Sequence, residues 1–189
     1  ALQNSLIDRT VDYVAERIQE YNSYVENPSM GIMLGQMGSA ISTSRRNVLS
    51  CHAVHLTTAN TQYCGIGNYA YNGMTGGYSA SFYGCIGGYM SLAHEVGHNI
   101  GLHHDLSAYG ASGINHGSCW DDVNGIRNCH RSIMSYAGCI TPRGASNCDR
   151  VPYFSANNVV EMGNVIGDTN TRNNAQQMRN NIFNFMGQF

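Results

Sequence analysis

The stretch HEVGHNIGLHHD, residues 94 to 105, carries four histidines and two carboxylates in a chain of which only 12% is charged. His94 and His98 are four residues apart, so on a helix their side chains project from the same face, one turn apart. This spacing lets two imidazole nitrogens reach one metal ion, which is the physical content of the pattern H-E-x-x-H. Glu95 can reach a water molecule beside the metal without being a ligand. The segment therefore predicts a metal centre on a helix, with a base next to it.

A catalytic zinc site needs a third protein ligand and leaves the fourth position to water. His103 and His104 both compete for the third place. On a straight helix, at about 100° per residue, neither would lie beside the first two histidines. Gly101 lets the chain turn, because glycine accepts a positive φ without a Cβ clash. Geometry alone leaves the choice between His103 and His104 open.

Length and composition exclude several classes of protein. The chain has 189 residues, which suits one compact domain or two small lobes, and 42% of them are apolar. No apolar run reaches the roughly 18 residues that a membrane span needs. The net charge of −2 comes from ten basic residues, none of them lysine, and twelve acids, with no basic block. Nucleic acids and anionic membranes are therefore not expected as partners, because clustered lysine and arginine hold both.

The chain has seven cysteines and no Cys-x-x-Cys pair, which favours disulfides over a thiolate metal site. Disulfides imply an oxidising compartment, so we expect a secreted protein, already free of its targeting segment and of any pro-segment. Short loops close most easily, which favours bridges between neighbours in the sequence. The predicted pairs are Cys64–Cys85, Cys119–Cys129 and Cys139–Cys148, with Cys51 left as a free, buried thiol.

Hydrophobic periodicity and turn residues predict the order of the main elements. Residues 64–88 are rich in glycine, tyrosine, serine and asparagine, which indicates turns, and the pattern after Asp105 is irregular for about 65 residues. We expect, in chain order, an amphipathic helix over 7–25, a strand over 30–37, a core strand over 48–56, an edge strand over 78–85, the histidine helix, and a closing helix over 175–185.

The histidine segment extends to H-E-x-x-H-x-x-G-x-x-H, and the sequence SIMSY follows at residues 132–136. Together these resemble the metzincin metalloproteases, in which the zinc motif is followed by a Met-turn. Counted from His94, the resemblance implies that His104 is the third zinc ligand and that His103 is a spare. It also implies that Met134 forms an apolar floor beneath the three imidazoles.

Two single residues refine this resemblance. Asp105, directly after the third histidine, resembles the adamalysin (reprolysin-like) branch. Tyr136 resembles the astacins and serralysins, in which the matching tyrosine leans over the metal. A closer similarity is to the bacterial peptidyl-Asp metalloendopeptidases, whose order of motifs is matched by residues 63–67, the zinc helix, the Met-turn, 153–155 and 173–175.

The fold that the resemblance implies is α+β. We expect a metzincin-type zincin with a mixed twisted sheet and helices in an upper lobe, the active-site helix, and an irregular, disulfide-stapled lower lobe with a C-terminal helix. Residues 1–189 would form a single catalytic domain, with an upper subdomain over 1–104 and a lower one over 105–189. The chain departs from the family at its N-terminus, where no strand precedes the first helix.

The function that follows is that of a secreted zinc endopeptidase, a zymogen product that acts on proteins or peptides as a monomer. Glu95 would serve as general base and then acid, and Tyr136 would steady the oxyanion. The edge strand near 78–85 would pair with an extended substrate. The alternatives are a zinc hydrolase acting on cell-wall crosslinks or esters, and a non-catalytic zinc-binding module. Glu95 speaks against the last, because a structural zinc site needs no base.

In metzincins, the segment after the Met-turn lines the pocket that binds the substrate side chain just after the scissile bond. Here it carries Arg143 and Arg150, and an arginine facing that pocket would favour a carboxylate. The resemblance implies cleavage on the amino side of Asp. The alternative, that both arginines point to solvent and leave an apolar pocket, stays open.

The other sequence patterns give weaker evidence of function. The run from Gly65 to Ala70 fits the dinucleotide pattern G-x-G-x-x-A, but no helix pattern follows it. Asp121, Asp122 and Asn124 could bind calcium but lack the spacing of a known calcium loop. The remaining histidines, at positions 52, 55, 116 and 130, are expected to be structural.

Overall fold

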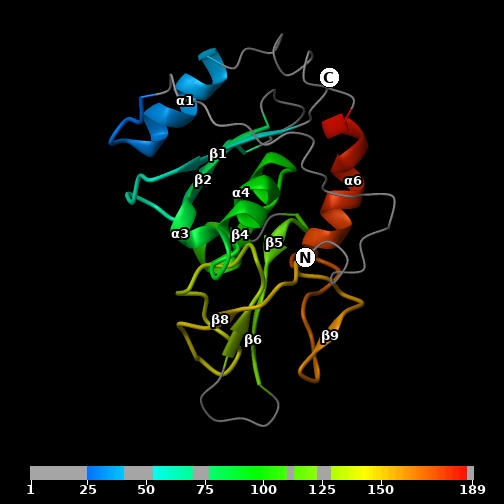
Figure 1. The fold of residues 1–189 in the computed structure, drawn as a ribbon. Helices are drawn as coiled ribbons and strands as arrows, with labels where there is room; N and C mark the ends of the chain where they lie inside the picture. The colour runs from blue at the N-terminus through cyan, green and yellow to red at the C-terminus, as the bar shows by residue number, and fades with distance from the viewer. Residues whose placement is uncertain (1–24, 41–52, 70–76, 110–112, 123–128, 187–189) are drawn as a thin grey trace. The chain divides into compact units, whose positions relative to one another are not determined.

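The computed structural model describes residues 25–40, 53–69, 77–109, 113–122 and 129–186. Of these, residues 25–100 belong to one compact unit and 101–182 to a second, and both mix helices with short strands (Figure 1). The helix predicted over 7–25, apart from Val25, lies outside the described residues, as do Cys51 and His52. The subdomain boundary after His104 stays a prediction. No helix in the described part of the chain is both long and apolar enough to cross a bilayer.

Helix α1, Met30–Ala40, stands where the sequence predicted a strand over 30–37, so that prediction was wrong. Its apolar residues recur at helical spacing, which places them on one face. That face is buried and consists of Met30, Met33, Leu34 and Met37. Glycine is a poor helix former, and the glycines of this segment obscured the helical pattern. Burial of the methionine face against the sheet outweighs the low propensity.

The first unit is built on a three-stranded sheet of β1, Val54–Thr58, β2, Gly65–Gly67, and β3, Tyr78–Phe82. Its order is β1-β3-β2, with β1 parallel and β2 antiparallel to β3. The strand predicted near 78–85 is confirmed over 78–82, but among the described strands β3 is central, so its predicted edge position was wrong. Residues 83–86 form helix α3, Tyr83–Ile86, instead. Small buried residues in β3, Ser79, Ala80 and Ser81, let helices approach the sheet closely.

Helix α4, Ser91–Asn99, packs against β2 and β3, as predicted for a helix carrying the histidine motif (Figure 1). Asn99, the last residue of the helix, hydrogen-bonds to the sheet and to the residue that follows β2. The Asn99 Nδ2 donates to the carbonyl oxygens of Asn68, at 2.7 Å, and Tyr78, at 3.0 Å. The helix ends at Asn99, Ile100 is its C-cap, and Gly101 follows with a φ of +90°. The chain turns at the glycine that the sequence pointed to.

The second unit consists of short strands held in small sheets, with a closing helix. The sheets pair β4 with β5, pair β9 with β10, and join β6, β7 and β8 in that order. The elements are β4 (His103–Asp105), α5 (Leu106–Tyr109), β5 (His116–Gly117), β6 (Cys119–Asp121), β7 (Cys129–Arg131), β8 (Asp149–Arg150), β9 (Val160–Glu161), β10 (Asn164–Val165) and α6 (Asn174–Met186). Helix α6 confirms the closing helix predicted over 175–185.

Three disulfides join Cys64 to Cys85, Cys119 to Cys139 and Cys129 to Cys148. The first pair was predicted; the predicted Cys119–Cys129 and Cys139–Cys148 bridges were wrong. Strand register explains why. Antiparallel pairing sets Cys119 opposite Arg131 and Cys129 opposite Asp121, at the two ends of the β6–β7 pair. Parallel pairing of β7 with β8 aligns His130 with Asp149, which brings the preceding residues, Cys129 and Cys148, side by side.

Candidate metal centre

Two of the predicted ligands lie one turn apart on α4. The ring centroids of His94 and His98 are 4.8 Å apart, edge to face. Because side chains at i and i+4 share a helical face, both rings point to the same side of the helix. The turn at Gly101 then returns the chain toward that side.

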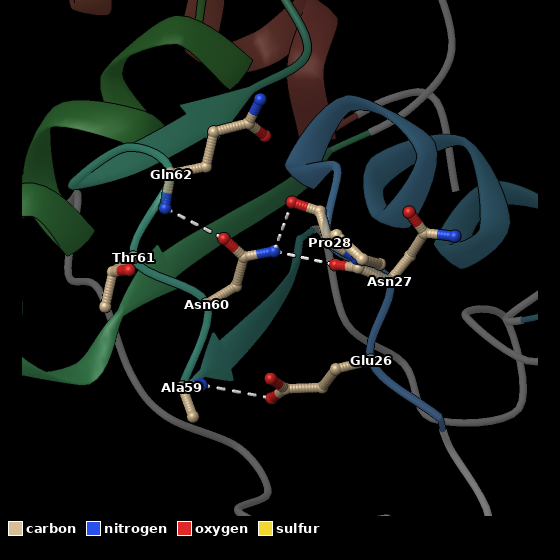
Figure 2. Close-up of a pocket in the computed structure, with 7 residues that line it drawn as sticks. All are labelled: Glu26, Asn27, Pro28, Ala59, Asn60, Thr61 and Gln62. Carbon is tan, nitrogen blue, oxygen red and sulfur yellow. Dashed lines mark hydrogen bonds between the residues drawn. The ribbon is translucent and has the colours of Figure 1, made fainter.

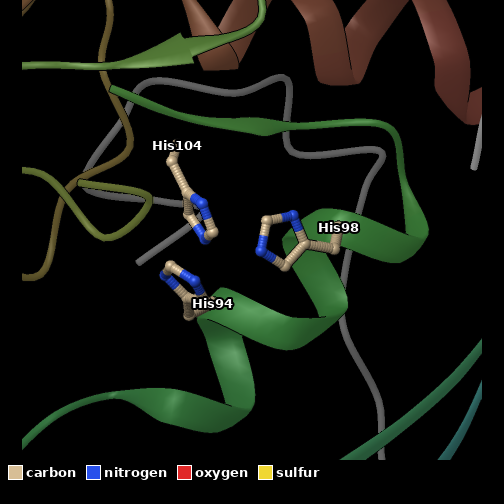
Figure 3. A group of neighbouring side chains, drawn as sticks. All are labelled: His94, His98 and His104. Carbon is tan, nitrogen blue, oxygen red and sulfur yellow. The ribbon is translucent and has the colours of Figure 1, made fainter. Parts of the chain in front are cut away.

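The strand after the turn decides between the two histidines that compete for the third place. Successive side chains of a strand point to opposite faces, so His103 and His104 of β4 diverge. One ring nitrogen from each of His94, His98 and His104 lies within 4.8 Å of the other two, and Figure 3 shows the three rings converging. His103 stacks on His116 instead, with centroids 5.6 Å apart. Burial, and then the charge of His116, lower the pKa of His103.

His104 is held from two sides. His116, which is only 1% exposed, donates its Nδ1–H to the His104 carbonyl oxygen at 2.9 Å. The Tyr136 ring lies against the His104 ring, with centroids 3.8 Å apart, while 48% of the Tyr136 side chain stays exposed. His116 therefore positions the backbone of His104. No motif in the sequence marks it for this role.

Glu95 is 5% exposed and sits on α4 between the two ligand positions of that helix. Its side chain faces β2, where Gly65 and Gly67 approach it closely. The sequence predicted a carboxylate beside the metal. It did not predict that this carboxylate would be buried against strand backbone.

The predicted Met-turn is a tight turn in which the Ser135 N–H donates to the Ser132 carbonyl at 3.1 Å. Met134 is completely buried within it. The Ser135 hydroxyl donates to the Ser118 carbonyl at 2.9 Å, which ties the turn to the chain beside β5. Asp105 accepts the Tyr136 N–H at 2.9 Å. This bond joins the residue after His104 to the residue that covers His104.

The arginines predicted for the substrate pocket lie in different surroundings. Arg143 donates its backbone N–H to the Asp121 carboxylate at 3.1 Å and its Nη1 to the Asp122 carbonyl at 3.4 Å. Arg150 donates its Nη2 to the Ser135 carbonyl at 3.1 Å. Arg131, which the sequence reasoning missed, donates to the same carbonyl at 2.6 Å and is buried. Two guanidinium groups thus meet at the carbonyl that precedes Tyr136.

A hollow of about 530 Å³ in the first unit is a separate feature, lined by residues 26–28 and 59–62 (Figure 2). Its walls are bonded to each other: the Ala59 N–H donates to the Glu26 carboxylate, and the Asn60 amide donates to the carbonyls of Asn27 and Pro28. It contains no histidine or cysteine. These contacts join the segment before α1 to the β1–β2 connection, so the hollow is a structural junction.

The donor set at the histidines fits zinc. Imidazole nitrogen is a preferred zinc ligand, and three imidazoles leave one tetrahedral position open. One nitrogen from each of the three rings lies within 4.8 Å of the other two, so the three can face a single ion. His94 and His104 are each 6% exposed, so little solvent competes at their rings. The three imidazoles can therefore hold one zinc ion, and the helix that supplies two of them also carries the buried Glu95.

Fold and site together define a class: mixed α/β proteins with a three-histidine metal centre on a helix and the strand that follows it. The sequence profile of metallo-peptidase family M12 matches residues 3–155. The chain belongs to this family, and with it to the metalloproteases. No solved structure matches the chain significantly.

Curated relatives agree with this membership. A peptidyl-Asp metalloendopeptidase of Stenotrophomonas maltophilia is 31% identical over 154 residues, which cover 77% of this chain and 33% of the relative. One of Xanthomonas campestris pv. campestris is 30% identical over 154 residues, covering 77% of this chain and 32% of the relative. The chain thus spans about a third of the length of these relatives.

Proposed function

We propose that this chain is a secreted zinc endopeptidase of the metzincin type that hydrolyses peptide bonds in proteins. The observation that carries the proposal is the convergence, within 4.8 Å, of one nitrogen each from His94 and His98 of α4 and His104 of β4, with the buried Glu95 on the same helix as the first two. Family membership supports the same reaction. Three disulfides support secretion, because such bridges persist in oxidising compartments.

His94, His98 and His104 would hold the ion. Zinc in such a site polarises a carbonyl group and makes water acidic enough to lose a proton near neutral pH. Glu95 accepts that proton as the water oxygen bonds to the peptide carbon. It then delivers the proton to the departing nitrogen as the carbon–nitrogen bond breaks. Tyr136, half exposed and lying against the His104 ring, would donate a hydrogen bond to the oxyanion.

We also propose that the pocket beyond the scissile bond favours a carboxylate, so that cleavage falls on the amino side of Asp. The names of the two relatives support this preference. Of the two predicted arginines, Arg150 has the better support, because its guanidinium reaches the carbonyl next to Tyr136. Arg143 reaches toward Asp121 and Asp122 and has less support.

The test of the reaction is an assay on a general protein substrate, before and after treatment with a chelator. We expect cleavage, its loss on chelation, and its return when zinc is added. Hydrolysis of an ester or of a cell-wall crosslink with no proteolysis would favour another zinc hydrolase. Zinc binding without hydrolysis of any substrate would favour a non-catalytic module. Either result would reject the proposal.

A further inference from the structure

Strand β2 has no side chain at the two points where it meets Glu95. A Cβ built on Gly65 would lie 2.5 Å from the Oε1 of Glu95, 2.7 Å from its Cγ and 2.8 Å from its Cδ. A Cβ built on Gly67 would lie 2.7 Å from the Glu95 carbonyl oxygen and 3.2 Å from its Oε2. Carbon atoms do not approach non-bonded atoms this closely, so neither position can carry a side chain while Glu95 stays where it is.

The alternation of the strand explains the pattern Gly-Ile-Gly. Residues i and i+2 of a strand share a face, so Gly65 and Gly67 both face α4 while Ile66 faces the other way. Ile66 packs against the methionine core of α1. In the sequence this run fits part of the dinucleotide pattern and also lies within residues 63–67, one of the stretches that resemble the peptidyl-Asp metalloendopeptidases. Glycine stands at positions 65 and 67 because β2 and α4 lie too close together for a side chain at either position.

The helix has little freedom to move away from the strand. Asn99 donates to the carbonyls of Asn68 and Tyr78, which lie just after β2 and at the start of β3. Glu95 is 5% exposed, so its side chain has little solvent space to retreat into. The carboxylate is therefore confined between the helix that carries it and the bare backbone of β2.

We propose that Gly65 and Gly67 are positioning residues for Glu95: their missing side chains let β2 hold the carboxylate in one orientation beside His94. The two act differently. All three atoms nearest to a Cβ on Gly65 belong to the Glu95 side chain, whereas the nearest to one on Gly67 is the helix backbone. The absence of a side chain at Gly65 thus fixes the position of the Glu95 carboxylate, and its absence at Gly67 fixes the distance between β2 and α4. The proposal rests on the proposed function of Glu95 as the base.

The kinetic test compares Gly65→Ala with Gly87→Ala. Gly87 lies in the same unit, has a φ of −77° that alanine adopts readily, and has nothing within 4 Å of its built Cβ. Misplacement of a catalytic group by about 1 Å lowers the rate ~100-fold, so kcat of Gly65→Ala should fall by roughly 10–100-fold. KM should stay within about threefold, because substrate binding does not pass through Glu95. Zinc content should stay at the wild-type level, and Gly87→Ala should match the wild type.

A thermal cycle tests the packing without any assay of activity. Gly65→Ala should lower the Tm in the wild-type background and lower it much less in a Glu95→Ala background, because the three atoms nearest to the new methyl group have then gone. Gly67→Ala should lower the Tm in both backgrounds, since the helix carbonyl remains. These Tm values still test the positioning role if Gly65→Ala folds too poorly for kinetic measurements.

The outcomes separate the two proposals. A wild-type protein without proteolytic activity rejects the proposed function, and the thermal cycle then still tests whether Gly65 acts through the Glu95 side chain. An active wild type together with a fully active Gly65→Ala overturns the positioning role. So does an equal loss of Tm for Gly65→Ala in the two backgrounds, because the methyl group would then be meeting something other than Glu95.

Discussion

Glu95 is the residue on which the proposed chemistry depends most, because it alone handles the proton. Replacing it with glutamine keeps the shape and removes the acceptor. We predict that Glu95→Gln binds zinc as the wild type does and loses turnover by a factor of about 10²–10⁴ or more. Elemental analysis of the purified variant is the control. A variant that keeps more than a few per cent of the activity would show that another group is the base.

The two adjacent histidines of β4 offer a matched pair of substitutions. His104 faces His94 and His98, whereas His103 stacks on His116. We therefore predict that His104→Ala loses most of its zinc and that His103→Ala retains it, as measured by metal content after dialysis. Equal loss in the two variants would reject the assignment of ligands.

Arg150 and Arg143 form a second matched pair. Arg150 reaches the carbonyl beside Tyr136, and Arg143 lies by Asp121 and Asp122. If a guanidinium selects the substrate, digestion of a mixed peptide library should give new N-termini enriched in Asp. Arg150→Ala should reduce that enrichment about tenfold, in keeping with the loss of one charge-assisted contact, and Arg143→Ala should reduce it less. Enrichment of leucine, phenylalanine or small residues in the wild type would instead indicate an apolar pocket.

At the scale of elements, strand register governs the covalent framework. The β6–β7 pair separates Cys119 from Cys129, and the β7–β8 pair unites Cys129 with Cys148. Loop-closure reasoning compares only the lengths of the loops, and here the strands override it. The same holds for α1, where burial of one methionine face overrides the low helix propensity of glycine.

Thiol labelling distinguishes the Cys129–Cys148 bridge of the structure from the Cys119–Cys129 bridge predicted from the sequence. In Cys129→Ser, the cysteine that loses its partner should be Cys148, so alkylation under non-reducing, denaturing conditions followed by mass spectrometry should label Cys148. Label on Cys119 would contradict the pairing. The double variant Cys129→Ser/Cys148→Ser should lose roughly 2–4 kcal/mol of unfolding free energy, because a disulfide restricts the unfolded chain.

At the scale of the whole molecule, one half-buried histidine couples folding stability to pH. Burial lowers the pKa of His55 from 6.5 to about 4, and its Nδ1 lies 2.7 Å from the Ser79 hydroxyl. In the unfolded chain His55 binds a proton below about pH 6.5, whereas in the folded chain it stays neutral down to about pH 4. His55 thus contributes stability that is complete above the unfolded pKa and is lost as the pH falls through this window.

The predicted consequence is a loss of unfolding free energy between pH 7 and about pH 4.5, measured by urea titration, that is smaller in His55→Gln than in the wild type. Glutamine fills similar space, can bond to Ser79 and does not titrate. Identical pH dependence in the two proteins would show that His55 does not carry this coupling.

The amino-acid sequence by itself determined the features that short-range geometry controls. Spacing of four on a helix brings His94 and His98 together, and a glycine is what the turn after them requires. The α4 and α6 helices, the strand character of residues 54–56 and the Cys64–Cys85 bridge follow in the same way from local pattern.

Only the tertiary structure decided the features that depend on partners distant in sequence. That His104 and not His103 turns toward His94 and His98, left open by helix geometry, follows from the pairing of β4 with β5, which fixes the face that each side chain takes. The cysteine pairs follow from the register of β6, β7 and β8. The need for glycine at position 65 follows from the approach of β2 to α4. Register and close packing depend on which segments meet, and a pattern within one segment carries no information about its neighbour.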